Sequence, residues 1–218
     1  MPACGGVDAG RAAPAVAGPP QRFRRPVAPH GVWRRAMSTT GAAGGGLVML
    51  IRHAEKPREP SEQAVDALGR PDAASLAVRG WQRAGALAAL FRDPPAPLRR
   101  PLALLAAARS PSHVSTRPRD TLLPLAAALG LEVEEPPEGA DSAERLAEAA
   151  AARDGPVLVC ARHEALPEIA RALGADGALP GSWPGDRYDV VWLVTPPRGP
   201  LRQWPQCLLA GDADAPIA

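Results

Sequence analysis

The 218-residue sequence has few cysteines, a single lysine and no long apolar run. Its three cysteines, Cys4, Cys160 and Cys207, are too few and too scattered for a disulfide framework or a cysteine-based metal cluster. We therefore expect a reducing, cytoplasmic compartment. No uninterrupted apolar run is long enough to cross a bilayer, so a membrane span is not expected. Because Lys56 is the only lysine among 25 basic residues, an isolated arginine carries little information here.

The formal net charge of +2 is unevenly distributed along the chain. Residues 1–46 hold six of the 25 basic residues and one of the 23 acidic residues, which leaves 19 basic and 22 acidic residues, a net charge of −3, for the remainder. A basic folded body would favour a nucleic-acid partner, and this mildly acidic one does not. We expect neither a nucleic-acid nor a membrane partner, and the sequence leaves the oligomeric state open.

Residues 1–46 are rich in Gly, Pro, Ala and Arg and have no periodic apolar pattern. Such a segment buries too little apolar surface to offset its ordering entropy, so we expect a disordered extension. A start of the natural protein at Met37 would delete nothing that can fold. Residues 47–212 are expected to form the folded domain.

Beyond residue 46, apolar runs alternate with helical patterns. Strands are predicted at 47–51, 102–108 and 157–161, and helices at 78–91, 117–129, about 142–153 and 164–173. The first helix is expected to bury one face made of Trp81, Ala84, Ala88 and Phe91. The runs 188–196 and 201–209 flank a Pro-Arg-Gly-Pro turn, which indicates an antiparallel hairpin. The fold class expected is α/β: a three-layer sandwich with a mostly parallel sheet and this hairpin at its edge.

Two short stretches, "LVMLIRHAEKP" and "VLVCARHEALP", each place an Arg-His pair directly after an apolar run. If the two strands are parallel, His53 and His163 emerge at the same edge of the sheet, where functional groups gather. The strand at 102–108 delivers Ser110 and Arg117 to that edge as well. Arginine forks match phosphate oxygens, and a neutral imidazole can attack phosphorus. No HExxH or Walker A spacing occurs, so metal-free phosphoryl transfer without a cofactor is expected.

Four segments in order resemble the histidine phosphatase superfamily, whose fold is called phosphoglycerate mutase-like. "LIRHAEKP" is similar to its Arg-His-Gly/Ala-Glu signature. "LAVRGWQRAGALA", "RSPSHVSTRPRDTLLPLAAALGL" and "GPVLVCARHEALPEIARAL" resemble three further conserved segments of that family, and together the four cover most of residues 47–209. The sequence departs from the family in having Ala77 where a helix-capping Ser or Thr is common.

The resemblance implies specific roles for matching residues. His53 would be the nucleophile that becomes phosphohistidine. Arg52 and Arg117 would clamp the phosphoryl oxygens, and His163 would stabilise the charge that develops on them. Water would then hydrolyse the intermediate.

The proton donor stays open at this point. The acid phosphatase branch of the family has an acid after the second histidine, which makes Glu164 a candidate, and Glu55 is its rival. Arg162 stands where the family has small residues, so it could add a third phosphate contact or face solvent. His113 could compete for the second-histidine role, but it lies in a Ser/Pro-rich loop.

The resulting expectation is a metal-independent phosphomonoester hydrolase of the histidine acid phosphatase type. Its partner would be a small phosphorylated substrate or a phosphoprotein. Alternatives are a protein phosphohistidine phosphatase, a phosphotransfer of the phosphoglycerate mutase type, and a non-catalytic phosphate-binding module. The mutase branch carries a Glu-Gly motif that this sequence lacks. Both Arg-His pairs and Arg117 argue against the non-catalytic module.

Overall fold

The computed structural model describes residues 46–111, 113–136, 142–177 and 179–218. The predicted disordered extension, residues 1–46, lies outside the described residues apart from Gly46. The Met37 start also lies outside them. The folded part includes residues beyond 212, because Ile217 is buried in the core. In this described part, no helix has both the length and the apolar character that a membrane crossing requires.

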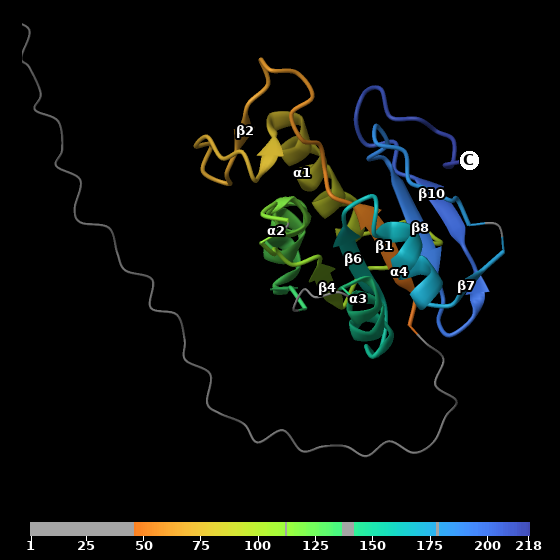
Figure 1. Cartoon of the computed structure of the whole chain (residues 1–218). Helices are drawn as coiled ribbons and strands as arrows, with labels where there is room; N and C mark the ends of the chain where they lie inside the picture. The colour runs from red at the N-terminus through yellow and green to blue at the C-terminus, as the bar shows by residue number, and fades with distance from the viewer. Residues whose placement is uncertain (1–45, 112, 137–141, 178) are drawn as a thin grey trace, which may run out of the picture. The chain divides into compact units, whose positions relative to one another are not determined.

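A six-stranded sheet forms the middle layer of the fold (Figure 1). Its strand order is β10-β8-β1-β6-β4-β5, with bounds β1 Val48–Arg52, β4 Ala103–Ala106, β5 Val133–Glu134, β6 Val157–Ala161, β8 Val190–Val194 and β10 Arg202–Pro205. Strand β6 is parallel to β1 and β4, and β4 is parallel to β5. Strand β8 is antiparallel to both β1 and β10. The predicted mostly parallel sheet with an antiparallel edge hairpin is therefore confirmed.

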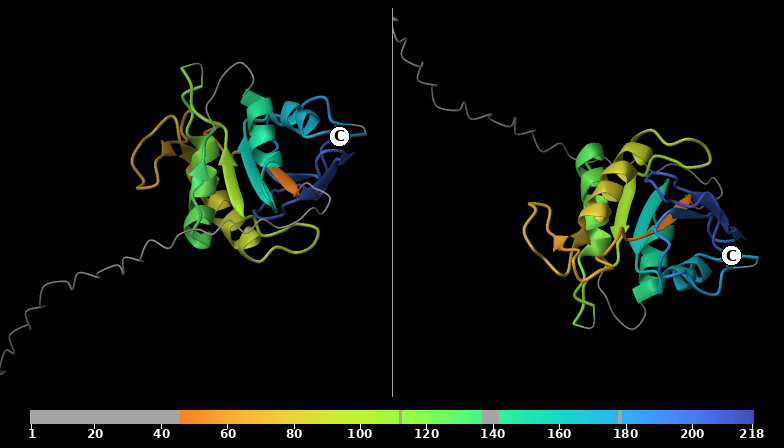
Figure 2. Two further views of the ribbon diagram at one scale, coloured as in Figure 1. Left: turned by 90° about the horizontal axis from the view of Figure 1, so that it is seen from below. Right: turned by 90° about the horizontal axis from the view of Figure 1, so that it is seen from above.

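Four helices cover the two faces of the sheet. Helices α1 (Val78–Arg92) and α2 (Arg117–Leu129) lie on one face, and α3 (Ser142–Ala151) and α4 (Leu166–Ala172) lie on the other, as the end-on views show (Figure 2). Residue 141, where the third predicted helix would be capped, lies outside the described residues. The three layers confirm the predicted α/β sandwich.

The apolar side chains of the central strands alternate between two cores. Met49 and Ile51 of β1 face α1 and α2, while Val48 and Leu50 face α3 and α4. Because both faces are covered, the strands are continuous apolar runs rather than alternating ones. This is why the runs were recognisable in the sequence.

Helix α1 buries a different face from the one predicted. Its buried residues are Gly80, Arg83, Ala84, Leu87 and Phe91, whereas Trp81 and Ala88 are only partly buried. Trp81 instead packs beside the hairpin before the helix and donates its indole N–H to the Val65 carbonyl at 2.8 Å. The observed face shares Ala84 and Phe91 with the predicted one but is turned toward Arg83 and Leu87.

Two small ribbons were not predicted. Strands β2 (Ala64–Val65) and β3 (Leu76–Ala77) form a short antiparallel hairpin between β1 and α1, and β7 (Ala175–Asp176) pairs in parallel with β9 (Gly199–Pro200). Each strand has two residues, which is too short for an alternating pattern to appear in the sequence.

Candidate active site

Strands β1 and β6 end together at the carboxyl edge of the sheet. Arg52 lies beside Ala161 in the register of the two strands, and the His53 amide donates to the Ala161 carbonyl at 3.0 Å. His53 therefore follows β1 directly, and His163 follows β6 by two residues. The expectation that both histidines emerge at one edge of the sheet is confirmed.

His53 is a buried, neutral imidazole. The residue has a relative exposure of 5%. Its Nδ1 lies 2.7 Å from the Ala54 carbonyl oxygen. A carbonyl only accepts, so Nδ1 carries the proton and Nε2 holds the free lone pair. Burial lowers the pKa of His53 to about 3, and the nearby charges of Arg52, Arg117 and His163 act in the same direction. An imidazole in this state needs no deprotonation near neutral pH to act as a nucleophile.

The low pKa gives a testable pH dependence of stability. In the unfolded chain the second ring nitrogen of His53 is protonated near pH 6.5, and in the folded protein it is protonated only near pH 3. The unfolded state thus binds more protons between these values, and stability falls as the pH drops through this window. When the pH falls from 7 to 4.5, we expect the unfolding free energy of wild type to decrease by about 2 kcal/mol more than that of the His53→Gln variant. Urea unfolding at both pH values measures this, and equal losses would contradict a buried neutral ring.

Arg52, directly before His53, is held by two backbone carbonyls and an aromatic ring. One terminal nitrogen donates to the carbonyls of Pro184 and Arg187 at 3.1 and 3.0 Å, and the guanidinium carbon lies 3.8 Å from the centre of the Tyr188 ring. Its Nε is a buried donor for which the described part of the protein offers no partner. Burial lowers the pKa of Arg52 from its ordinary value, but arginine stays charged at physiological pH.

The chain end supports the carbonyls that hold Arg52. Arg187 donates from Nε to Asp189 at 2.7 Å and from a terminal nitrogen to the Ala215 carbonyl at 2.7 Å. The second carboxylate oxygen of Asp189 accepts from the Ala213 amide at 2.7 Å. Ile217, 3% exposed, anchors this C-terminal segment in the core.

Arg117 is the first residue of α2 and is fixed by backbone carbonyls. Its Nε donates to Ser75 at 2.9 Å and a terminal nitrogen donates to Ala73 at 2.8 Å. One side of the guanidinium group is therefore bound to the segment before β3. The charge of Arg117 lowers the pKa of His53.

Thr121 links helix α2 to the segment after β1 through two hydrogen bonds. Its hydroxyl oxygen accepts from the Ala54 amide at 2.8 Å, and the hydroxyl donates to the Arg117 carbonyl at 2.7 Å. The side chain is fully buried. A single residue thus links the residue after His53 to the start of α2.

His163 and Glu164 lie in the connection between β6 and α4. Nδ1 of His163 is 3.0 Å from a carboxylate oxygen of Glu164. The His163 side chain is 26% exposed and that of Glu164 is 68% exposed, so this pair faces the solvent-accessible side of the site. Burial and the charges of Arg52 and Lys56 lower the pKa of His163, against the opposing effect of Glu164.

The predicted site residues influence one another electrostatically. The charge of His163 acts on His53, that of Arg52 acts on both histidines, and that of Glu164 acts on Arg52. Lys56, which follows His53 by three residues, acts on His163. The site therefore combines a neutral imidazole, a second histidine and three cationic side chains.

The two Arg-His pairs are not structurally equivalent. Since Arg52 aligns with Ala161 rather than with Arg162, the second pair comes one residue later in the register. Arg52 is 1% exposed, whereas Arg162 is half-buried and lines a small hollow with Ala107 and Ala143 near α3. The cations that lower the pKa values of the two histidines are Arg52, Arg117 and Lys56. A phosphate contact by Arg162 therefore stays a prediction.

Glu55 is paired behind the site. Arg83, 2% exposed, donates to both oxygens of Glu55 at 2.8 to 3.1 Å and to both oxygens of Asp212 at 2.6 and 3.0 Å. The half-exposed Arg79 adds a contact to Glu55 at 3.4 Å. Burial alone would lower the pKa of Arg83, but its bonds to Asp212 and Glu55 raise it above the ordinary value. Glu55 is thus part of a buried ion network, while Glu164 faces solvent.

Sequence reasoning missed four residues that shape the site: Arg83, Asp212, Thr121 and Tyr188. Arg83 looked like a surface residue of an amphipathic helix, and Asp212 lies far from it in the sequence. The Tyr188 ring lies against Arg52, and its centre is 6.1 Å from that of His53. The one available signal was that Tyr188 is the only tyrosine of the chain. Over the described ranges, no three His, Cys, Asp or Glu side chains are grouped to hold a metal ion.

Comparisons with known proteins gave structural matches only. No family model and no curated protein sequence matches the chain. The chain is similar to the native mycobacterial glucosyl-3-phosphoglycerate phosphatase (15% identity, TM-score 0.45, covering 73% of this chain and 97% of that one). A structure assigned as the phosphohistidine phosphatase SixA of Agrobacterium tumefaciens is 19% identical, with a TM-score of 0.45 and coverage of 72% and 94%. A structure named mycobacterial hydrolase 2 is 16% identical, with a TM-score of 0.40 and coverage of 80% and 94%. Assignment to the histidine phosphatase superfamily therefore continues to depend on the sequence motifs and the geometry of the site.

Proposed function

We propose that the protein is a phosphomonoester hydrolase of the histidine phosphatase superfamily, of the histidine acid phosphatase type, which works through a phosphohistidine on His53. The observation that carries the proposal is the state of His53, a buried neutral ring whose Nε2 lone pair lies in the field of Arg52 and Arg117. Hydrolysis of an aryl phosphate that depends on His53 tests it. A protein that hydrolyses none of a broad panel of phosphomonoesters would contradict it.

In the first step, Nε2 of His53 attacks phosphorus, the N–P bond forms and the P–O bond to the alcohol breaks. The guanidinium groups of Arg52 and Arg117 stabilise the negative charge on the transferring phosphoryl oxygens. Backbone carbonyls already hold both guanidinium groups in place, which supports this role. His163 would donate from Nε2 to the same oxygens in its protonated form, with Nδ1–H directed at Glu164.

The alcohol leaves with a proton, for which Glu164 is the better placed donor. Glu55 has both oxygens engaged by Arg83, whereas Glu164 is exposed and lies against His163. In the second step, water attacks the phosphohistidine, the N–P bond breaks, and Glu164 takes the proton from the water. Phosphate leaves and His53 regains its lone pair.

The Glu164→Gln variant is expected to distinguish leaving groups. Loss of a general acid costs about 10²–10⁴ in rate when the leaving alkoxide is basic. A nitrophenolate needs little protonation, so its release should slow much less. We expect kcat for an alkyl phosphate to fall at least about tenfold more than kcat for p-nitrophenyl phosphate. The exposed Glu168→Gln of α4 is the control, and an equal loss on both substrates would exclude Glu164 as the donor.

A non-catalytic phosphate-binding module is less well supported. Binding phosphate requires cations and donors, which Arg52 and Arg117 supply, but it gives no reason to bury an uncharged imidazole between them. The lone pair of His53 would be a poor partner for a bound anion. Hydrolysis accounts for the ring as well as for the cations.

A further inference from the structure

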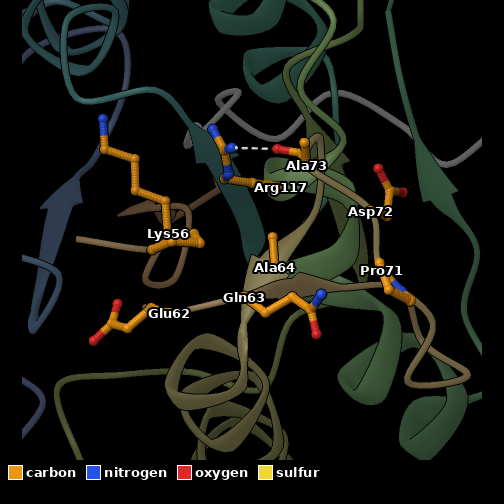
Figure 3. Close-up of a pocket in the computed structure, with 9 residues that line it drawn as sticks. Lys56, Glu62, Gln63, Ala64, Pro71, Asp72, Ala73 and Arg117 are labelled. Atoms are coloured by element: carbon orange, nitrogen blue, oxygen red, sulfur yellow. Dashed lines mark hydrogen bonds between the residues drawn. The ribbon is translucent and has the colours of Figure 1, made fainter. Parts of the chain in front are cut away.

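A hollow of about 470 Å³ is lined in part by Arg117, which together with Arg52 forms the proposed phosphate clamp. Its lining includes Lys56, Glu62, Gln63, Asp72, Ala73 and Arg117 (Figure 3). We call it the hairpin pocket, because β2 and the turn before β3 form its wall. Its volume is within the range of small-molecule sites, roughly 300–1,000 Å³.

The hairpin pocket adjoins the reaction centre. Arg117 belongs to both, and its bond to the Ala73 carbonyl ties the clamp to the pocket wall (Figure 3). Lys56 also lines the pocket and acts on the pKa of His163. A substrate whose phosphate is held by Arg117 would therefore extend its alcohol part into this pocket.

The wall of the pocket is built in advance. The Asp72 amide donates to the Ala64 carbonyl at 3.0 Å, and the indole of Trp81 donates to the Val65 carbonyl from behind at 2.8 Å. Residues 64 and 65 pair with residues 77 and 76 of β3. Binding would thus require little ordering of this wall, which favours affinity.

Charge is distributed unevenly around the pocket. The cations Lys56 and Arg117 lie on one side, and Glu62 and Gln63 lie on the side opposite Arg117, with Asp72 next to Pro71 (Figure 3). Carboxylate oxygens accept hydrogen bonds from hydroxyl groups and repel a second anion. An amide both donates and accepts, so it suits a hydroxyl in either role.

Resting on the proposed function, we propose that the hairpin pocket binds the alcohol part of a small polyhydroxylated phosphomonoester, such as a sugar monophosphate. Gln63 contacts its hydroxyl groups, and Glu62 disfavours a second phosphate. The pocket thereby selects monophosphates of polyols over bisphosphates. A phosphoprotein substrate is the alternative that the second experiment below distinguishes.

Gln63 suits the test, because replacing its amide disturbs no contact that holds the described part of the fold together. It is exposed, and within the described ranges its side chain has no hydrogen bond to protein. By contrast, Glu62 accepts from the Arg58 amide at 2.8 Å and Asp72 accepts from the Ala74 amide at 2.9 Å. Changing Asp72 would disturb the segment that holds Arg117.

The first experiment compares Gln63→Ala with Gln82→Ala, a matched control at an exposed position of α1. KM and kcat are measured for a hexose monophosphate and for p-nitrophenyl phosphate. Loss of one or two hydrogen bonds predicts a rise of about 3- to 10-fold in KM for the hexose phosphate relative to that for the aryl phosphate, in Gln63→Ala only. Equal effects of both variants, or equal effects on both substrates, would overturn the role of Gln63.

The second experiment tests charge exclusion with Glu62→Gln, which keeps an acceptor for the Arg58 amide. Wild type should prefer a hexose monophosphate to a hexose bisphosphate, and the variant should narrow that preference by about 2- to 5-fold, as expected for an exposed charge. Faster turnover of a histidine-phosphorylated carrier protein than of any small monophosphate would overturn the proposal. If aryl phosphate hydrolysis itself is absent, the proposed function fails instead.

Discussion

Replacing His53 by alanine is expected to abolish phosphatase activity, with kcat for aryl phosphate falling on the order of 10⁴-fold or more. Among the described residues, no other histidine combines a neutral ring with the same burial. The substitution removes one side-chain hydrogen bond, which goes to the neighbouring Ala54 carbonyl, so the fold should persist. Steady-state kinetics and circular dichroism measure the two outcomes.

The control for this variant is His113→Ala, since His113 is an exposed histidine of the loop before α2. It should keep wild-type kcat and KM. Acid-labile phosphate trapped during turnover should map to His53 in wild type and be absent from His53→Ala. Activity retained without His53, or lost without His113, would refute the assignment of the nucleophile.

Replacing Arg83 by methionine is expected to cost about 3–5 kcal/mol of unfolding free energy. The substitution leaves the carboxylates of Glu55 and Asp212 buried without their shared cation, with side-chain exposures of 5% and 3%. Breaking a buried pair from one side costs far more than the pair contributes, because the remaining charges lose solvation without compensation. Urea unfolding at pH 7 measures the loss.

Arg92→Met, at the exposed last turn of the same helix, is the matched control and should change stability by less than about 1 kcal/mol. The Glu55→Gln, Arg83→Met double variant should recover part of the loss, because one buried charge is removed with its partner. A loss for Arg83→Met no larger than that for Arg92→Met would show that the network contributes little to folding.

Hydrophobic patterning predicted the layers of the fold well. The helix over 117–129 and the strand over 157–161 have the predicted bounds, because both are long apolar patterns with clear ends. The predicted hairpin at the sheet edge is also present. The two-residue strands β2, β3, β7 and β9 were missed, since they exist through tertiary contacts and leave no periodic signal.

The candidate site was predictable to the extent that it lies at strand ends. The rule for parallel sheets placed His53 and His163 at one edge without any side-chain information. It could not give the one-residue offset between the strands, which separates Arg52 from Arg162 in burial and surroundings. Register is set by long-range packing, and so is the pairing of Arg83 with Asp212, 129 residues apart.

The support of Arg52 by the end of the chain links catalysis to the order of synthesis. His53 precedes the residues whose carbonyls hold Arg52, residues 184 and 187, and Arg187 is itself held through residues 213 and 215. These contacts span more than 130 positions, so they close late in folding. A nascent chain would thus contain the His53 imidazole well before Arg52, part of the proposed phosphate clamp, is held in place.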